Sequence, residues 1–533
     1  MAENLITGSI QAPGFSGLDI QDASVQLTSG YALEAFNCVI DKYGRIGARK
    51  GWTPVNTSSS GSTEKFKTIF ELAKSDGNVV ISAANNKIYT GTTTLTQATV
   101  RNAANSADLS YTITDDNWQV VAMPYDNGGN TSAHAIMVQA GHYPLMYHKL
   151  SSTTHTHTGG YGFQRLGDFG TLPVGYTVTS FMPDCAMSAF GRLWCANIVG
   201  DNQRVYFSDL QDPTNFTTGT AGYLDISTVI PTGDGIVAMA SHNGFLVIFC
   251  HRSIVIYENP LDPSQLVLRD VIKGFGCIAR DSVASVFGAD IMFLSETGVQ
   301  SLGRLIQEKS APLRDVSKNV RDDLIANVNT ETLKDIKAVY YAPEAFYLLS
   351  LPSVGFTYCF DTRGVLENGS ARTTIWKDIV PRAFFVTEAK ELYIGKTGYI
   401  GKYNGYQDNG SSYRWTYYTN YFDFDQPTTL KILKKLGLVV IGGGAQTIAI
   451  KWGFDYTNNY NSSVIVTEQT HVAEYGTAEY GIAEYSNGIA LDSLKFNATG
   501  SGRVLQIGFE SDINGSPLSV QKVDIAIKTG KNI

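Results

Sequence analysis

The chain has 533 residues, of which 43% are hydrophobic and 17% charged, with a formal net charge of −8. This composition supports a large apolar core, and its acidic balance argues against tight binding of nucleic-acid phosphates. Because glycine (52) and tyrosine (29) are abundant and long charged helical stretches are nearly absent, we expect an all-β protein with many short strands.

The cysteines occur singly, mostly inside apolar stretches, and no C-x-x-C pair is present. They are Cys38, Cys185, Cys195, Cys250, Cys277 and Cys359. We predict buried free thiols in a chain folded in a reducing cytoplasm, with disulfide bonds as the alternative.

The sequence shows no targeting or membrane segment. The segment Met1–Asn4 lacks a basic region followed by an apolar run, so we expect no signal peptide. No apolar stretch reaches membrane-spanning length, so we also expect no membrane-spanning segment.

Residues 1–60 are predicted to form a separate N-terminal arm and docking segment. The segment is polar and glycine-rich, with a strand-like piece near Phe36–Ile40 and a serine-rich run at Thr57–Thr63 typical of a flexible joint. A basic cluster beside an aromatic ring lies just before that joint. Such a cluster can contact phosphate or an acidic partner surface, the alternative being a solvated turn that docks on the next domain. The candidate partner-binding residues are Arg45, Arg49, Lys50 and Trp52.

Strand–turn–strand units recur through residues 61–425, at a spacing near the ~50 residues of the larger propeller repeats. Each hairpin is too small to bury its own apolar face. We therefore predict that the copies stack around an axis as a β-propeller of six or seven blades. The clearest units lie at 191–209, 243–257 and 289–303, with weaker copies at 77–91 and 390–403.

One helical pattern interrupts the hairpins, at Val316–Lys337. Val320, Leu324 and Val328 recur at steps of four residues, while Asp322 and its neighbours make the opposite side polar. This spacing predicts an amphipathic helix that lies across the outside of a blade or reaches a neighbouring subunit.

Residues 426–533 read as a C-terminal β-sandwich-like domain. Leu430–Val440 and Thr447–Phe454 are predicted strands joined by a turn at Gly442–Gly444, and Ser516–Lys531 alternates as a final strand. A five-residue Ala-Glu-Tyr repeat lies between them. Its odd period turns successive tyrosines to opposite faces, which suits a ribbon packed on both sides or a loop that meets a partner. The repeat contributes Tyr475, Tyr480 and Tyr485 as further candidate partner-binding residues.

Motifs for catalysis or metal binding are nearly absent, so we expect no enzyme activity, no catalytic or metal-binding residue and no cofactor. The Gly395-Lys396-Thr397 letters lack the upstream glycine of a phosphate loop and predict a turn. His155 and His157 have metal-ligand spacing, but their Thr/Ser/Gly-rich context favours an exposed loop. Five aspartates are weak candidates for glycoside hydrolysis and are more typical of turn caps: Asp209, Asp212, Asp225, Asp234 and Asp361.

Several short motifs lie near the two ends of the chain and in its hairpins. They are Gly17–Asp19, Ala35–Asp41, Gly44–Trp52, Arg204–Asp209, Asp212–Phe216, Phe356–Asp361 with Trp376, Ser519–Val523 and Lys528–Lys531. Together they resemble one family: the nozzle, tail tubular or packaged-DNA stabilisation proteins of short-tailed bacteriophage tails. The N-terminal motifs resemble the entry segment of that family, and the later ones are similar to its blade elements and terminal strand. The likeness covers most of the chain, although residues 100–180 and the Ala-Glu-Tyr repeat match none of it.

The resemblance implies a structural protein of the virion tail: a homohexameric ring that extends the DNA channel below the portal and adaptor. Such a ring retains packaged double-stranded DNA, lets it pass during ejection without sequence-specific binding, and anchors fibres, spikes or a needle.

The residues leave two alternatives open. One is a receptor- or glycan-binding propeller at a tail tip, in which Tyr413, Trp415, Tyr417 and Tyr418 stack on sugars. The other is a polysaccharide-cleaving propeller.

Overall fold

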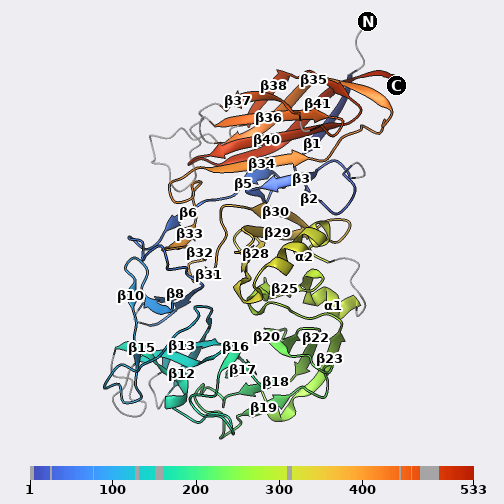
Figure 1. The fold of residues 1–533 in the computed structure, drawn as a ribbon. Helices are drawn as coiled ribbons and strands as arrows, with labels where there is room; N and C mark the ends of the chain where they lie inside the picture. Colours follow the sequence, from blue (N-terminus) through green and yellow to red (C-terminus); the bar gives the residue numbers. More distant parts are fainter. Residues whose placement is uncertain are drawn as a thin grey trace.

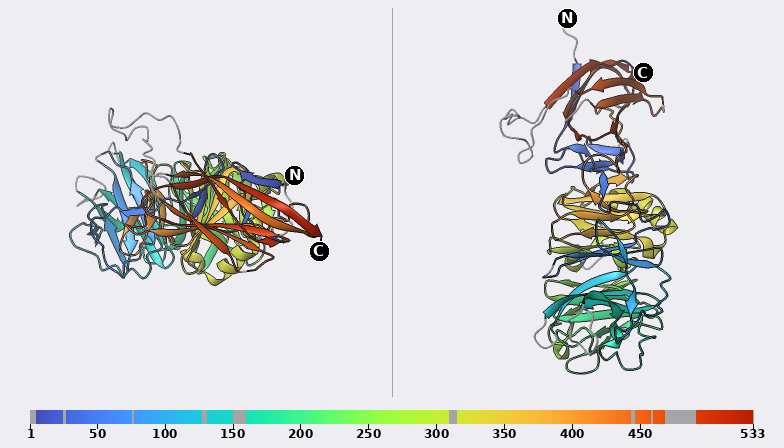
Figure 2. Two further views of the ribbon diagram at one scale, coloured as in Figure 1. Left: turned by 90° about the horizontal axis from the view of Figure 1, so that it is seen from above. Right: turned by 90° about the vertical axis from the view of Figure 1, so that its left-hand side faces the viewer.

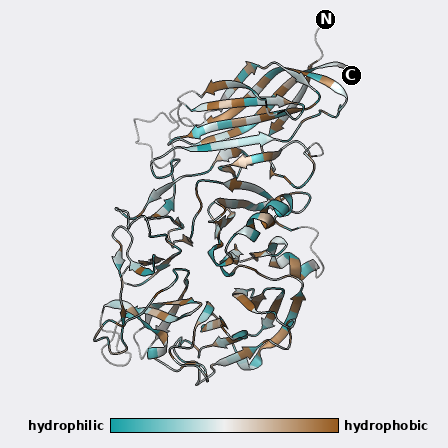
Figure 3. Ribbon diagram, in the orientation of Figure 1, coloured by the Kyte–Doolittle hydropathy of each residue, from teal (hydrophilic) through white to brown (hydrophobic). Residues whose placement is uncertain are grey.

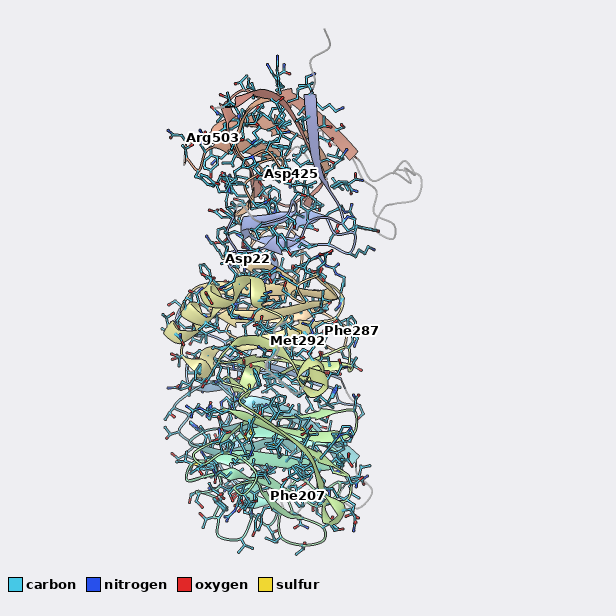
Figure 4. All side chains as sticks on the ribbon, turned by 90° about the vertical axis from the view of Figure 1, so that its right-hand side faces the viewer. Asp22, Phe207, Phe287, Met292, Asp425 and Arg503 are labelled. Carbon is cyan, nitrogen blue, oxygen red and sulfur yellow. The ribbon has the colours of Figure 1, made fainter. Side chains whose placement is uncertain are left out.

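The predicted hairpins form small sheets that stand in a ring, and a β-sandwich adjoins one side of that ring (Figure 1). The computed structural model describes residues 5–24, 27–75, 77–126, 131–149, 160–308, 315–442, 446–457, 459–467 and 491–532. Figure 2 shows that the sandwich extends the ring in its own plane, so the molecule is elongated. In Figure 4, Asp425 and Arg503 lie in the sandwich, and Phe207 lies in the part of the ring farthest from it.

Six of the sheets in the ring are separate from the rest of the fold, and they are the blades of a β-propeller. Each is built from strands that follow one another in the chain, apart from one N-terminal strand. The blades are β7–β10 (Thr68–Leu72, Val79–Ala84, Lys87–Thr90, Thr96–Gln97), β11–β15 (Val100–Arg101, Gln119–Asp126, Thr131–Gln139, His142–Lys149, Tyr161–Arg165), β16–β19 (Pro183–Ala189, Arg192–Ile198, Asp201–Phe207, Gly222–Asp225), β20–β23 (Ile236–His242, Phe245–Cys250, Ser253–Glu258, Val267–Lys273), β24–β26 (Ala284–Val286, Asp290–Ser295, Gly298–Ser301) and β31–β33 (Phe384–Val386, Leu392–Gly395, Ile400–Tyr403) with β6 (Trp52–Pro54).

A further four-stranded unit completes the ring between β24–β26 and β31–β33. Its strands are β27–β30 (Lys337–Tyr341, Phe346–Leu351, Phe356–Val365, Ala371–Trp376), and they belong to a ten-stranded sheet that runs on into the sandwich. The ring therefore has six self-contained blades and one unit shared with the sandwich, which agrees with the predicted six or seven. Because β6 from the N-terminal region pairs with β33, an early strand closes the ring against a late one.

Local sequence explains the hairpins. Asn243 and Gly244 have φ values of +49° and +81°, and Asn85 and Asn86 have values of +51° and +59°. Two successive positive φ angles are the geometry of the two-residue turns that match strand twist, and asparagine and glycine adopt them most easily. Strand β21 is buried at five of its six positions because both faces of its blade meet neighbouring blades. Figure 3 shows the resulting apolar stretches along the strands.

The sandwich has two sheets, and both chain ends contribute to it. One sheet has the order β38-β35-β41-β5-β4, with β1 also paired to β41 and β39 to β35. The other is the far half of the ten-stranded sheet, β2-β3-β34-β40-β36-β37. The strands are β1 (Leu5–Gln11), β2 (Gly17–Leu18), β3 (Tyr31–Phe36), β4 (Cys38–Ile40), β5 (Ile46–Ala48), β34 (Tyr413–Thr419), β35 (Thr429–Gly442), β36 (Thr447–Phe454), β37 (Asn461–Val466), β38 (Leu491–Asn497), β39 (Ser501–Gly502), β40 (Leu505–Ile513) and β41 (Leu518–Asn532).

The domain boundaries at 1–60, 61–425 and 426–533 therefore need correction. Residues 1–60 are not a separate arm, because β1–β5 pair within the sandwich and β6 pairs within a blade. Strand β34 also leaves the predicted propeller range for the sandwich. The strands predicted at 430–440 and 447–454 exist, but they do not pair as a hairpin, because β35 and β36 belong to different sheets. The residues 443–445 between them lie outside the described ranges.

Helices are few and short among the residues that the structure describes. There, the α-helices are α1 (Leu302–Glu308) and α2 (Arg321–Thr330), and the 3-10 turns are η1 (Leu166–Asp168), η2 (Pro263–Gln265), η3 (Arg280–Ser282), η4 (Lys318–Val320) and η5 (Leu333–Asp335). The helix predicted over 316–337 is thus shorter than expected, since Glu331 leaves the helical conformation and Lys337 already begins β27. Its predicted apolar side is present, with Leu324 and Val328 buried.

Candidate functional site on the propeller axis

The predicted basic cluster lies at the junction of the two domains, and part of it is inaccessible. The Arg49 side chain is fully buried and donates from Nη1 and Nη2 to the two carboxylate oxygens of Asp408, at 2.9 and 2.7 Å. Its Nε donates to Oδ1 of Asn37 at 3.0 Å, and its guanidinium lies 3.9 Å from the centre of the Tyr413 ring. Arg49 therefore joins the sandwich to the propeller and is not a partner-binding residue.

The other members of the cluster are also tied into the fold. Trp52 is 7% exposed and packs in the core of the β31–β33 blade. Arg45 is buried and pairs with Asp41 at 2.7 Å. Lys50 remains partly exposed and pairs with Glu344 at 2.6 Å. Burial alone lowers the pKa of Lys50, but the Glu344 charge more than offsets this and raises it.

The remaining sequence candidates divide into those outside the described residues and those with a structural role. Tyr475, Tyr480, Tyr485, His155 and His157 lie outside the described ranges. The predicted sugar-stacking aromatics are buried core residues and present no ring to a ligand. Their exposures are 4% for Tyr413, 0% for Trp415, 0% for Tyr417 and 8% for Tyr418.

The five aspartates considered for glycoside hydrolysis all bond to nearby groups. Asp209 accepts from the Thr220 amide at 2.9 Å, Asp212 from the Thr214 amide at 2.9 Å and Asp225 from the Ser227 amide at 2.9 Å. Asp234 and Asp361 likewise accept backbone amides. The turn-cap interpretation is confirmed. All six cysteines are buried free thiols, as predicted.

A cluster of charged residues that the sequence did not single out crosses the axis of the ring. Arg280, in η3, donates from Nε and Nη2 to the two carboxylate oxygens of Asp281, each at 2.9 Å. Its Nη1 donates to Oδ1 of Asp184 at 2.9 Å, and its Nη2 donates to the Asn117 carbonyl oxygen at 3.0 Å. Lys337 donates to both Asp281 and the Asn117 side-chain oxygen.

The cluster continues toward the blade that begins at β7. The side-chain Nδ2 of Asn117 donates to the carbonyl oxygen of Lys334 at 2.5 Å, and Lys334 Nζ lies 2.5 Å from Oδ2 of Asp115. Lys67 Nζ pairs with Asp115 at 3.3 Å and with Asp335 at 2.9 Å. We call this set the axial belt: Lys67, Asp115, Asn117, Asp184, Arg280, Asp281, Lys334, Asp335 and Lys337.

The axial belt spans the bore. Asn117 precedes β12 and Lys337 begins β27, and in ring order two blades separate them on one side and three on the other. A direct hydrogen bond between these two residues therefore joins opposite sides of the ring. Belt residues from five units lie just before or at the start of the first strand, which places them all toward one face of the propeller, here called the start face.

Electrostatic interactions favour the ionised form of two belt carboxyl groups, Asp281 and Asp115. Burial raises the pKa of Asp281, but the Arg280 and Lys337 charges more than offset burial and keep that pKa well below its usual range. Burial also opposes ionisation of Asp115, whereas its bonds to Lys334 and to a backbone amide lower its pKa to about 2. Burial lowers the pKa of Lys337, an effect that Asp281 only partly offsets.

Two cavities adjoin the belt, and both have Arg280 and Asp281 in their walls. The first, of about 410 Å³, lies on the start face and is lined mainly by polar residues from several blades. The second, of about 420 Å³, lies within the bore, where Phe70 and Phe385 make an aromatic pair with centroids 5.2 Å apart. The belt therefore divides the propeller axis into an outer chamber on the start face and an inner chamber within the bore.

Other kinds of site are not evident in the described ranges. There, no group of three or more His, Cys, Asp or Glu side chains is arranged to hold a metal ion. Neither α1, α2 nor any other described helix has the length and apolarity that a membrane crossing requires.

Comparisons with known proteins leave the family open. The sequence matches no family model and no curated protein. Among solved structures, similarity extends to the Pan2 WD40 domain of Neurospora crassa, at 9% identity and a TM-score of 0.36, over 66% of this chain and 96% of that one. PorZ, a bacterial surface component of the type-IX secretion system of Porphyromonas gingivalis, matches at 12% identity and 0.34, over 66% of this chain and 37% of PorZ. The extracellular domain of a putative one-component system from B. thetaiotaomicron matches at 10% identity and a TM-score of 0.26, over 75% of this chain and 45% of that one. Likenesses this distant do not bear on function.

Proposed function

We propose that the chain is a structural subunit of a short-tailed bacteriophage tail, one of six copies in a nozzle ring below the portal and adaptor. The proposal starts from the sequence resemblance, and one observation, the axial belt, decides where a DNA conduit would lie. Because side chains from opposite blades bond across the axis, a DNA duplex has no path through a single propeller. A conduit for DNA would therefore lie between subunits, at the centre of a ring of copies.

The shape of the subunit suits such a ring. The ten-stranded sheet and the buried Arg49–Asp408 pair join propeller and sandwich into one elongated unit. A closed ring needs two different surfaces that meet by rotation, and an elongated unit offers distinct surfaces at its two ends and along its sides. Six copies carry a formal charge of −48, six times the −8 of one chain. A net acidic conduit repels phosphate, so DNA would pass without adhering.

The role proposed is assembly, without enzymatic activity or a cofactor. The ring would hold packaged genome, release it during ejection and anchor fibres, spikes or a needle at its far end. Its place would be the virion tail, after folding in the host cytoplasm.

Electron microscopy and native mass spectrometry of the full chain test this function, alone and mixed with the portal–adaptor complex of the same virus. We expect a sixfold ring, at least on the adaptor, with a central opening between subunits. A monomer under both conditions, or a position away from the central axis of the virion, would overturn the proposal.

A second candidate function is a receptor- or glycan-binding propeller. The observation that favours it is the cavity on the start face, because a concave site where polar groups from several blades converge is a candidate ligand site. The two candidates differ in their assembly: a ligand-binding propeller binds its ligand as a monomer, whereas the nozzle function requires the ring.

A further inference from the structure

We infer that the polar cavity on the start face binds a neutral carbohydrate, at the size of a mono- or disaccharide. The inference rests on the second candidate function, ligand binding by the propeller, and is independent of the ring. The cavity of about 410 Å³ is within the range of small-molecule sites, toward its lower end. Its mouth is accessible, since His251 is exposed and Leu333 is 42% exposed.

The charges in the wall argue against an ionic ligand. Arg280 is already paired with Asp184 and Asp281, and Lys334 is paired with Asp115. The wall thus has three carboxylates against two cations, all within ion pairs, so no free positive charge is offered to a phosphate or carboxylate. A divalent cation is also disfavoured, because each carboxylate already holds a lysine or arginine.

The same wall suits hydroxyl groups. A paired carboxylate oxygen keeps a second lone pair that accepts from an O–H, and amide and imidazole groups both donate and accept. Gln139 is 3% exposed and its Oε1 has no hydrogen-bond partner, although its Nε2 donates to the Asp115 carbonyl at 2.9 Å. Asn197 and His251 add further polar groups from neighbouring blades. A polyhydroxy ligand supplies donors and acceptors in the alternation that these groups require.

The apolar part of the wall is aliphatic. Val237, Ile278, Ala279 and Leu333 line the cavity. Their aliphatic side chains offer apolar contact to the C–H groups of a sugar ring. Since the ion pairs hold the belt side chains in place before any ligand arrives, little side-chain entropy is lost on binding.

Saturation-transfer NMR on the full chain tests this inference with a defined set of probes. The sugars are glucose, galactose, mannose, rhamnose, N-acetylglucosamine and lactose; inorganic phosphate and glycine are the charged probes. We expect saturation transfer to at least one sugar, and none to phosphate or glycine.

Two pairs of variants locate the binding. His251→Ala and Asn197→Gly each remove a polar group from the wall, and we expect each to weaken sugar binding about tenfold. Arg252→Ala is the control for the first, because Arg252 is the next residue, is exposed and does not line the cavity. Asn243→Gly is the control for the second, because Asn243 also has a positive φ, of +49° against +60°, and lies outside the cavity wall.

Several outcomes would overturn the inference. Sugar binding that survives both wall variants places the ligand elsewhere. Binding of phosphate or glycine that the wall variants abolish would keep the propeller as a binding module but refute the carbohydrate. Absence of transfer to every probe would refute the ligand-binding function as well, while leaving the ring to the microscopy.

Discussion

The propeller and the sandwich are both built from antiparallel strands, but they pair strands at opposite extremes of sequence separation. In the blades nearly every strand pairs with the next one along the chain, as β20 does with β21. In the sandwich β1 pairs with β41, so that Leu5 lies opposite Lys528. Local pairing needs only a good turn, whereas end-to-end pairing carries the entropy cost of bringing together strands separated by almost the whole chain.

The contrast extends to the two buried ionic sites. Arg49 is isolated from water at the junction of the domains, with one bidentate carboxylate partner. Arg280 lies in the axial belt beside two cavities that water can enter, and its partners come from several blades. We therefore expect the junction to couple the two domains and the belt to act on the propeller alone.

The largest effect is expected for Arg49→Met. Removing one partner of a buried ion pair leaves Asp408 uncompensated, which costs about 3–5 kcal/mol of unfolding free energy. Because the variant loses this pair but keeps the ten-stranded sheet as a connection between the domains, the urea unfolding transition should broaden toward two steps. Arg204→Met is the control, since Arg204 is 42% exposed in its side chain and its loss should leave the urea midpoint nearly unchanged. Equal losses in the two variants would refute a special role for the junction.

A smaller effect is expected for Arg280→Met. Hydrogen bonds to charged groups contribute about 1.5–3 kcal/mol, and water in the cavities can replace part of the loss. The rate of amide hydrogen exchange should rise in β12, β16 and β24, the strands that begin at the belt, and stay unchanged in β35 and β41. Arg280→Lys keeps the charge but not the two-pronged geometry. Its hydrogen-exchange rates in these strands should therefore lie between those of the wild type and those of Arg280→Met. Faster exchange in the sandwich would contradict the separation of the two regions.

Acid should weaken the belt as well. The pKa of Asp115 is about 2 in the folded protein against 3.8 ordinarily, so its ionised form stabilises the fold above about pH 4. That contribution is lost as the pH falls from about 4 toward 2, because protonation then favours the unfolded chain. Urea midpoints measured from pH 6 to pH 3 should fall less in Asp115→Asn than in the wild type. An identical fall would show that Asp115 does not contribute.

The smallest effect is expected for Lys50→Ala, next to Arg49 in the chain. Lys50 is 39% exposed in its side chain and pairs with Glu344 at the surface. Surface pairs of this kind contribute about 0–1 kcal/mol, so one unfolding transition should persist with nearly the same midpoint. A split transition would mean that the junction depends on both basic residues.

Features that depend on local pairing could be predicted from the sequence, and features that depend on long-range contacts could not. The hairpins at 191–209, 243–257 and 289–303 could be predicted because turn residues and apolar runs lie together in the chain. Arg49 looked like a surface residue because its partner Asp408 is 359 residues away. The axial belt had one faint signal, charged residues just before the first strands of the blades, and no motif linked them.

Local sequence by itself determined the all-β class, the blade hairpins, the buried free cysteines and the final strand, because each depends on residues a few positions apart. Tertiary structure alone decided that the N-terminal strands join the sandwich and the last blade, that three members of the basic cluster (Arg45, Arg49 and Trp52) are buried, and that opposite blades meet on the axis. Closing a ring brings residues together over distances that no local pattern records, and burial then decides whether a charge binds a partner or holds the fold.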